Sequence, residues 1–323
     1  MSIAAYIKVI GRGKDGARPL DTDQSRDLFR QVLDGQVTDL EVGAFCLAMR
    51  IKGEAAPELD GFVQATLARC IPIQEAAWAS PRGVVVLPSY NGARKLPNLT
   101  ALLALKLAEA GVGVLVHGPL TDPTRVTTAQ VFAAAELPLV SSVGELTAAW
   151  QARQPAFMDI EALCAPLARL LAVRWTIGLR NPAHTVAKLL DPFAALGPQG
   201  VRSIRVVNHT HPEYAHALTD YLQHTSANAL LMRGTEGEPV ADARRQPRLE
   251  VFLHGQRDAS LSVAPVEGVL GALPDLPTEH GADITARYIA QVMTGTQAMP
   301  PAIQTQVDCL TQALRLVSST TAG

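Results

Sequence analysis

The chain has 323 residues, of which 48% are hydrophobic, 5% aromatic and 18% charged. This length and composition allow a sizeable core and either two domains or one large domain. The formal net charge of −2 excludes a global attraction to nucleic acid or to a membrane surface. Any anionic partner must therefore meet a local basic patch.

The four cysteines lie far apart and form no Cys-x-x-Cys pair; they are Cys46, Cys70, Cys164 and Cys309. This spacing predicts reduced thiols in a reducing compartment, so we expect a cytoplasmic protein. The first residues lack a basic start followed by an apolar run, so no signal peptide is expected. No stretch reaches the roughly 18 consecutive apolar residues of a membrane helix, so no membrane partner is expected.

Residues 1–75 are expected to be helical. Apolar residues recur at helical spacing in 21–34, 39–52 and 57–70. Asp21 and Thr22 can cap the first of these helices, and Gly35 and Gly53 follow the first and second. Pro57 suits the start of the third helix, where its missing N–H costs nothing.

The pattern changes near residue 80 to that of a parallel sheet. Residues 83–87 predict a buried strand, 88–97 a polar loop, 98–111 a helix and 112–116 a second strand. Such units build parallel sheets. Further helices are expected at 127–136, 212–224, 283–294 and 301–317, and further strands at 203–207, 229–232 and 249–253. The segment 234–248, rich in Gly, Pro and charge, is expected to be a mobile or partner-binding loop.

Three segments resemble motifs of the anthranilate phosphoribosyltransferase family, whose helical domain is shared with pyrimidine nucleoside phosphorylases. They are Leu33–Glu54, Gly178-x-Arg180 followed by Asp191-Pro192, and Gly281-Ala-Asp-Ile-Thr-Ala-Arg287. The resemblance covers nearly the whole chain. It implies an α/β protein with a small N-terminal helical domain and a larger α/β domain whose central, mostly parallel sheet is flanked by helices.

The implied helical domain comprises residues 1–75, with a hinge and helical return near 163–192, and the α/β domain comprises 80–162 and 193–323. Known family members are usually homodimers through the helical domain. We therefore expect a homodimer here, with apolar residues such as Val37, Leu40 and Phe45 available for the interface.

The resemblance is poor where the family binds phosphoribosyl diphosphate. Family enzymes carry Gly-Thr-Gly-Gly-Asp-Gly after the first strand, whereas this chain has Ser89-Tyr-Asn-Gly-Ala-Arg-Lys95. A glycine-rich turn lets backbone N–H groups approach a diphosphate, and here only Gly92 remains. Pro119 also replaces the Asn of the family's His-Gly-Asn motif. The residues expected to form a vestigial substrate site are Asn91, Gly92, Asn98, Thr100 and His117.

Metal and catalytic residues are not expected. The nearest candidates for the family's magnesium-binding acidic pair are Glu236 and Glu238, and they matter only if the chain is an active transferase. His209, His211 and Glu213 lack the further ligands of a tetrahedral metal site, so capping and packing are expected for them. No Gly-x-Ser-x-Gly motif occurs, and the segment 11–18 lacks the Gly-Lys-Ser/Thr ending of a P-loop. We therefore expect no cofactor.

Several further segments resemble the YbiB-type branch of the family, which is associated with nucleic-acid binding. They are Gly11-Arg-Gly-Lys14, 180–190, Thr210-His-Pro-Glu-Tyr214 and 233–240. The resemblance thus implies a nucleic-acid-binding protein rather than a biosynthetic enzyme.

The distribution of basic residues supports the same interpretation. Residues 81–108 and 162–190 contain no Asp or Glu but carry four Lys or Arg each, and the implied fold brings both stretches to one cleft. The alternative is that acids from elsewhere in the fold pair with these cations. Arg174 also matches the family's acceptor-binding arginine. The candidate phosphate-binding residues are Arg94, Lys95, Arg174, Arg180, Lys188, Arg244, Arg245 and Arg248.

These observations favour a protein that binds single-stranded DNA or RNA without sequence specificity, mainly through phosphate contacts because aromatic residues are scarce. Two alternatives stay open. One is an active pentosyltransferase with an altered phosphate loop, in which Arg94 and Lys95 hold a phosphate and Glu236 and Glu238 hold magnesium. The other is a purely structural or regulatory dimer.

Overall fold

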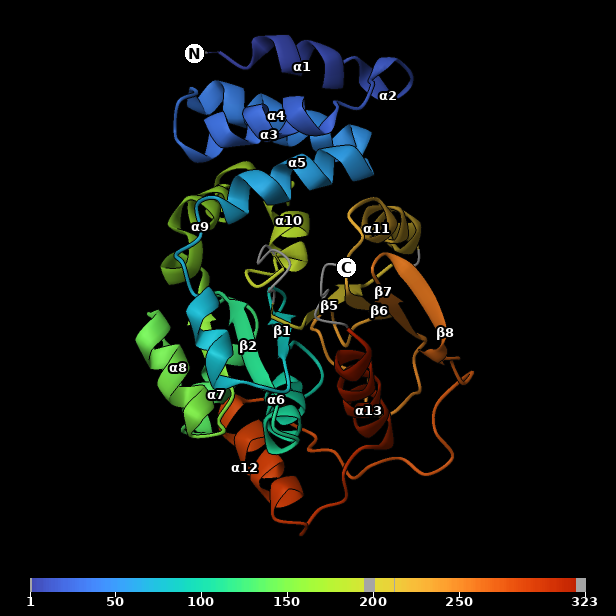
Figure 1. Cartoon of the computed structure of the whole chain (residues 1–323). Helices are drawn as coiled ribbons and strands as arrows, with labels where there is room; N and C mark the ends of the chain where they lie inside the picture. The colour runs from blue at the N-terminus through green and yellow to red at the C-terminus, as the bar shows by residue number, and fades with distance from the viewer. Residues whose placement is uncertain (1, 195–200, 212, 318–323) are drawn as a thin grey trace, which may run out of the picture.

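The computed structural model describes residues 2–194, 201–211 and 213–317, and it begins with a stack of short helices (Figure 1). These are α1 (Ala4–Ile10), α2 (Gly13–Gly16), α3 (Thr22–Leu33), α4 (Asp39–Lys52) and α5 (Ala56–Leu67). Asp21 caps α3 by accepting the Gln24 N–H at 2.8 Å, and Thr38 caps α4 by accepting the Glu41 N–H at 3.3 Å. The expected helices of this region are confirmed to within three residues at each end.

An eight-stranded sheet forms the centre of the rest of the chain, in the order β3-β4-β2-β1-β5-β6-β7-β8. The strands are β1 (Val84–Pro88), β2 (Gly113–Gly118), β3 (Leu139–Val140), β4 (Ala156–Asp159), β5 (Ser203–His209), β6 (Ala229–Arg233), β7 (Leu249–Leu253) and β8 (Gln256–Val263). All pairs from β3 to β6 are parallel, and β7 and β8 add two antiparallel pairs. The expected α/β class with a mostly parallel sheet is confirmed.

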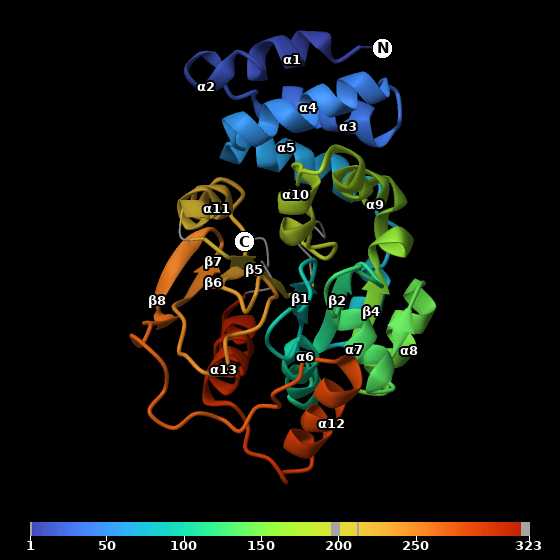
Figure 2. The same cartoon turned by 180° about the vertical axis from the view of Figure 1, so that it is seen from behind.

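Helices cover both faces of this sheet (Figures 1 and 2). They are the 3₁₀ helix η1 (Gln74–Ala79) and the α-helices α6 (Thr100–Glu109), α7 (Thr128–Ala134), α8 (Val143–Gln151), α11 (Glu213–His224), α12 (Ala282–Met293) and α13 (Pro301–Leu316). The start of the helix predicted at 212–224 falls on Pro212, which lies outside the described residues.

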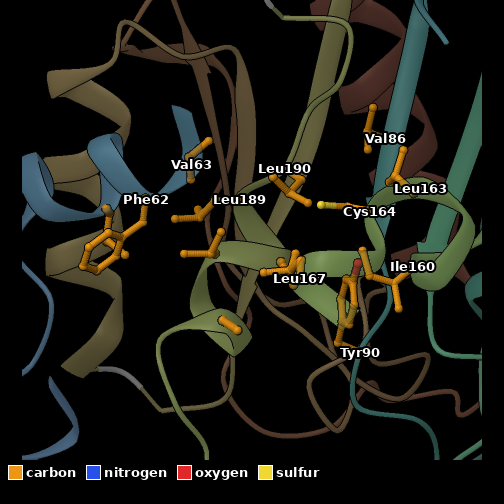
Figure 3. Packing of buried hydrophobic residues seen from close by; sticks show 14 of the residues in the cluster. Phe62, Val63, Val86, Tyr90, Ile160, Leu163, Cys164, Leu167, Leu189 and Leu190 are labelled. Atoms are coloured by element: carbon orange, nitrogen blue, oxygen red, sulfur yellow. The ribbon is translucent and has the colours of Figure 1, made fainter. Parts of the chain in front are cut away.

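Two helices return to the N-terminal stack: α9 (Ile160–Ile177), which contacts α3, and α10 (Ala183–Leu189), which contacts α5. Buried side chains of α5, α9 and α10, such as Phe62, Leu167 and Leu189, pack in one cluster with Val86 of β1 and Tyr90 (Figure 3). This cluster joins the N-terminal helices to the carboxyl end of the sheet.

Of the two alternatives expected for the segment 234–248, a mobile loop is wrong, and partner binding stays a prediction. The segment 234–248 is packed against the protein rather than extended into solvent, and Val240, Ala241 and Ala243 are buried. The side chain of Gln306 on α13 accepts the Ala241 N–H at 2.8 Å and donates to the Pro239 carbonyl at 3.0 Å. Burial of backbone groups requires such partners, and a helix 65 residues later in the chain supplies them.

Among the described residues, no helix is both long enough and apolar enough to cross a lipid bilayer.

Candidate functional site

The loop 89–97 follows β1 at the carboxyl edge of the sheet, where open α/β proteins place their ligands. The turn 234–238, which follows β6, lies directly against it. Asn91 Nδ2 donates to the Glu236 carbonyl at 3.0 Å. Gly237 has φ +88°, and a Cβ at this position would stand 1.8 Å from Asn91 Nδ2. Glycine is therefore required for so close an approach of the turn to the loop.

Glu238 is buried in the loop, with 1% of its surface exposed. Its Oε1 accepts the backbone N–H groups of Asn91 and Gly92, each at 2.7 Å. Its Oε2 accepts the Ser89 hydroxyl and, at 3.0 Å, the Thr128 hydroxyl. Three of these donors belong to the loop and the fourth, Thr128, begins α7, so the oxygens of Glu238 are already bonded within the protein.

Glu236 accepts hydrogen bonds from the next part of the same loop. A single oxygen, Oε2, accepts the N–H groups of Arg94, Lys95 and Leu96 at 2.9, 3.0 and 3.2 Å. Burial opposes ionisation of Glu236, but these three donors together with Arg125 outweigh it and lower the pKa of the carboxyl group. The residue adopts φ +51°, a conformation that costs energy for a non-glycine residue.

The two carboxylates therefore occupy the anion-binding groups of the loop. Consecutive N–H groups that converge on one point form the kind of concavity that binds phosphate in other proteins. Here the anions are Glu236 and Glu238, and five N–H groups are bonded to them. The residues present do not fit a diphosphate, because its oxygens would need the same donors. A magnesium ion would also require carboxylate oxygens, and oxygens of both Glu236 and Glu238 are bonded to the loop.

The other residues of the expected vestigial substrate site are buried and bonded within the protein. Asn98 Nδ2 donates to the Thr128 hydroxyl at 2.9 Å, and Asn98 Oδ1 accepts the Thr100 N–H at 3.3 Å. His117 is fully buried and its Nδ1 lies 2.7 Å from the Tyr90 hydroxyl. Burial lowers the pKa of His117 to about 4, so the ring is neutral at pH 7. The Tyr90 ring itself lies beside Ile160 and Leu167 in the core (Figure 3).

Only part of the two acid-free stretches lies near this loop, because Arg82 and Lys106 of the first stretch line a separate pocket with Glu109, to which Lys106 is ion-paired. Arg94 and Lys95 are exposed at the surface of the loop, and neither has an ion-pair partner within 4.0 Å among the described residues. Arg125 lies close to residues of both stretches. Its guanidinium donates to the Gly92 carbonyl at 3.3 Å, and its positive charge contributes to lowering the pKa of Arg180. Burial, followed by the charges of Arg174 and Arg125, lowers the pKa of Arg180.

Four of the predicted phosphate-binding residues are placed differently from these. Lys188 is partly buried, and its Nζ donates to Asn208 Oδ1 and to the Gly237 carbonyl, each at 3.1 Å. Burial, with help from Arg180 and Arg125 and against Glu238, lowers its pKa to about 8. Arg244 and Arg245 lie 2.9 and 4.0 Å from Asp242, which reduces the charge they offer, and Arg248 is exposed.

Sequence reasoning missed two features of this surface. Arg125 stands outside both acid-free stretches, so charge counting did not find it. Trp175 is 56% exposed, and the Arg174 guanidinium lies 4.2 Å from the centre of its ring. An Arg-Trp pair within a basic stretch is the signal that would have indicated a stacking surface.

The helical part and the whole chain both resemble known proteins. Residues 5–70 match the family described as "Glycosyl transferase family, helical bundle domain". The uncharacterised protein YbiB of Escherichia coli (strain K12) is 38% identical over 309 residues, covering 96% of this chain and 93% of that protein. An anthranilate phosphoribosyltransferase of Methylorubrum extorquens (strain PA1) is 28% identical over 289 residues, covering 86% of this chain and 80% of the enzyme.

Solved structures show the same fold. Anthranilate phosphoribosyltransferase from Thermus thermophilus superposes with a TM-score of 0.66 at 18% identity, over 98% of this chain and 90% of the other. The Saccharomyces cerevisiae enzyme in complex with PRPP and Mg superposes with a TM-score of 0.68 at 12% identity, over 98% and 88%. On its 38% identity to a relative that it matches over nearly its full length, and on this shared fold, the chain belongs to the anthranilate phosphoribosyltransferase-like glycosyltransferase family 3.

Proposed function

We propose that this protein binds single-stranded nucleic acid without sequence specificity, on a transferase scaffold whose diphosphate site is filled by its own side chains. The observation that carries the first part is a set of arginine and lysine side chains near the loop 89–97 that form no ion pair within 4.0 Å with any residue that the structure describes. They are Arg94, Lys95, Arg125, Arg174 and Arg180. The observation that carries the second part is the bonding of five loop N–H groups to Glu236 and Glu238.

These cations suit a phosphate backbone rather than a single small anion. Arg94 and Lys95 are exposed on the loop 89–97, next to Gly92, whose carbonyl Arg125 contacts. On its other side, Arg125 is close enough to Arg180, and Arg174 to Arg180, for their charges to interact. Arg can hold phosphate oxygens with two parallel hydrogen bonds. The exposed ring of Trp175 offers a face on which an unpaired base can stack. The bases of a duplex are paired and cannot stack there, so this feature favours a single strand. The alternative of an active transferase requires the loop N–H groups that the two carboxylates already bond.

The expected result of a titration with fluorescent single-stranded DNA is a steep dependence on salt. The logarithm of the association constant should fall by about 0.7 per log unit of salt for every phosphate contacted. The double variant Arg94→Ala/Lys95→Ala should lower both the affinity and this slope, whatever the base sequence. The matched variant Arg287→Ala/Arg315→Ala removes the same charge from exposed helix positions of α12 and α13 and should change neither. Affinity that is flat with salt, or equal in the two double variants, contradicts the proposal.

A homodimer through the N-terminal helices is also part of the proposal. Leu40, Leu47 and Ile51 of α4 are 84%, 49% and 58% exposed, and their spacing of seven and four residues places them on one helix face. Of the residues expected at this interface, Phe45 is excluded because it is fully buried, 6.1 Å from the ring of Phe29 and 5.9 Å from that of Phe62.

We expect light scattering at micromolar concentration to report twice the chain mass of 34.3 kDa. Leu40→Glu/Leu47→Glu should give monomers, because buried carboxylates at an interface lack partners. Leu139→Glu, at a residue that is 47% exposed on β3, should leave the dimer intact. A monomeric wild type would refute the prediction.

A further inference from the structure

A second pocket lies beside the loop 89–97 without sharing a residue with it. It has a volume of about 370 Å³ and lies between the α4–α5 connection above, α10 on one side and the end of β5 with α11 on the other. Figures 1 and 2 show α10 and α11 below α5, and both helices contribute residues to the pocket. Its size falls in the range of pockets that bind small molecules. Lys188 separates it from the loop, because Nζ bonds to Gly237 in the turn that caps the loop.

The charged groups of the pocket favour an anion. Arg50, Arg180 and Lys188 line it, opposed by the single carboxyl group of Glu54. Neither Arg50 nor Arg180 has an acidic partner within 4.0 Å in the part of the chain that the structure describes. Lys188 is hydrogen-bonded to two neutral oxygens, and the carboxylate that acts on it electrostatically, Glu238, is already bonded to the loop 89–97. Cations crowded in this way are stabilised when a ligand brings negative charge.

A buried donor in the pocket lacks a partner. Asn208 is 2% exposed, and its Nδ2 makes no hydrogen bond with the residues that the structure describes, while its Oδ1 accepts from Lys188. The lysine fixes the orientation of the amide, because an ammonium group can only donate. An unsatisfied buried donor is costly, and an acceptor oxygen on a ligand would satisfy it.

The remaining wall is apolar and partly aromatic. Met49 and Leu59 line it from the helical side, and Tyr214 and Leu218 line it from α11. A pocket that joins three cations and an amide donor to such a wall suits a molecule with a phosphate at one end and a flat, largely uncharged ring system at the other.

We propose that this pocket binds one nucleotide unit, with its phosphate between Arg50, Arg180 and Lys188 and its base against Tyr214 and Leu218. The choice of a nucleotide rests on the proposed function, because Arg180 belongs both to this pocket and to the basic surface. The unit can be a free nucleoside monophosphate or the 5′-phosphorylated end of a single strand, which present the same chemistry.

Calorimetry on the full chain tests the pocket directly, with adenosine 5′-monophosphate, adenosine and inorganic phosphate as probes. The monophosphate should bind at least about tenfold more tightly than either part alone, because each part can make only some of the contacts. Arg180→Gln should weaken it by about tenfold or more through the loss of a charge-assisted hydrogen bond. Arg169→Gln, at an exposed position of α9 outside the pocket, should not.

A second pair of variants fills the space without changing its charge. Ala217→Phe places a ring in the pocket from α11 and should reduce monophosphate binding by about tenfold or more, whereas His216→Phe on the exposed face of α11 should leave it within about twofold. Unchanged melting temperatures establish that both variants are folded. Binding that is absent at millimolar monophosphate, or that is equal in both members of each pair, overturns the pocket.

Two single strands of one sequence, with a 5′-phosphate or a 5′-hydroxyl, distinguish the two sources. A preference for the phosphorylated strand that monophosphate abolishes assigns the pocket to strand ends, and equal binding of the two strands assigns it to the free nucleotide. Salt-dependent strand binding without monophosphate binding would leave the proposed function standing and remove the pocket. Monophosphate binding through Arg180 without strand binding would do the reverse.

Discussion

Replacing Glu238 with alanine should lower the free energy of unfolding by about 3–5 kcal/mol. The carboxylate is 1% exposed and accepts two backbone N–H groups and two hydroxyls. Hydroxyls can rotate toward other acceptors, but the N–H groups of Asn91 and Gly92 are fixed by the backbone. Each would be left buried without a partner, at a cost of about 1–3 kcal/mol. The partly buried ammonium of Lys188 would also lose a nearby opposite charge.

Urea unfolding measures this loss of stability. One conservative variant and one control variant accompany Glu238→Ala. Glu238→Gln keeps one carbonyl oxygen for the N–H groups but turns an amide donor toward Ser89 and Thr128, so we expect a loss between that of alanine and zero. Glu267→Ala removes an exposed carboxylate and should stay within about 0.5 kcal/mol of the wild type. If Glu238→Ala also stays within about 1 kcal/mol, the carboxylate is not the anchor of the loop.

The second large effect that we expect is that the protein does not bind phosphoribosyl diphosphate tightly in the presence of magnesium. Hydrogen bonds from N–H groups to a charged oxygen contribute about 1.5–3 kcal/mol each. Losing even two of them weakens binding by roughly two to four orders of magnitude. In this chain all five of the loop N–H groups described above are bonded to Glu236 or Glu238. Calorimetry should therefore detect no tight site, and anthranilate should not be consumed.

The variant Glu236→Gly makes this expectation sharper. It frees the N–H groups of Arg94, Lys95 and Leu96, and glycine suits the φ of +51° at this position. Inorganic pyrophosphate should bind this variant more tightly than the wild type. Glu267→Gly serves as the control for the loss of one negative charge. A micromolar dissociation constant for phosphoribosyl diphosphate in the wild type, with turnover of anthranilate, would contradict the self-filled loop.

Local sequence was sufficient for the elements whose signals are local. The capping residues Asp21 and Thr38 bond within three residues of themselves, and the apolar run that forms β1 is buried on both faces. Such patterns depend on helix and strand periods, which are properties of the chain itself. The loss of the glycine-rich turn after β1 and the two acid-free basic stretches were likewise visible in the sequence, as was the α/β class.

Elements with weak local signals were not predicted from their periodicity, and the helical return that includes α9 was expected only from the family resemblance. Helix α9 contains Pro166 and a non-helical Cys164, so its periodicity is interrupted. Strand β4 has only four residues, and β8 is half exposed with mixed polar residues. Their conformations are supported by neighbours that are distant in sequence: β4 pairs with β2, and β8 pairs with β7. Sequence windows contain no information about such partners.

The use of Glu236 and Glu238 was decided by tertiary structure alone. From the sequence they were the nearest candidates for a magnesium site, because carboxylates are magnesium ligands. Their actual donors lie 140 to 147 residues earlier in the chain, in the loop after β1. Only the parallel arrangement of β1, β5 and β6 brings the loops at the carboxyl ends of these strands together. The sequence therefore determined that the diphosphate loop had changed, whereas the fold determined which anion replaces the diphosphate.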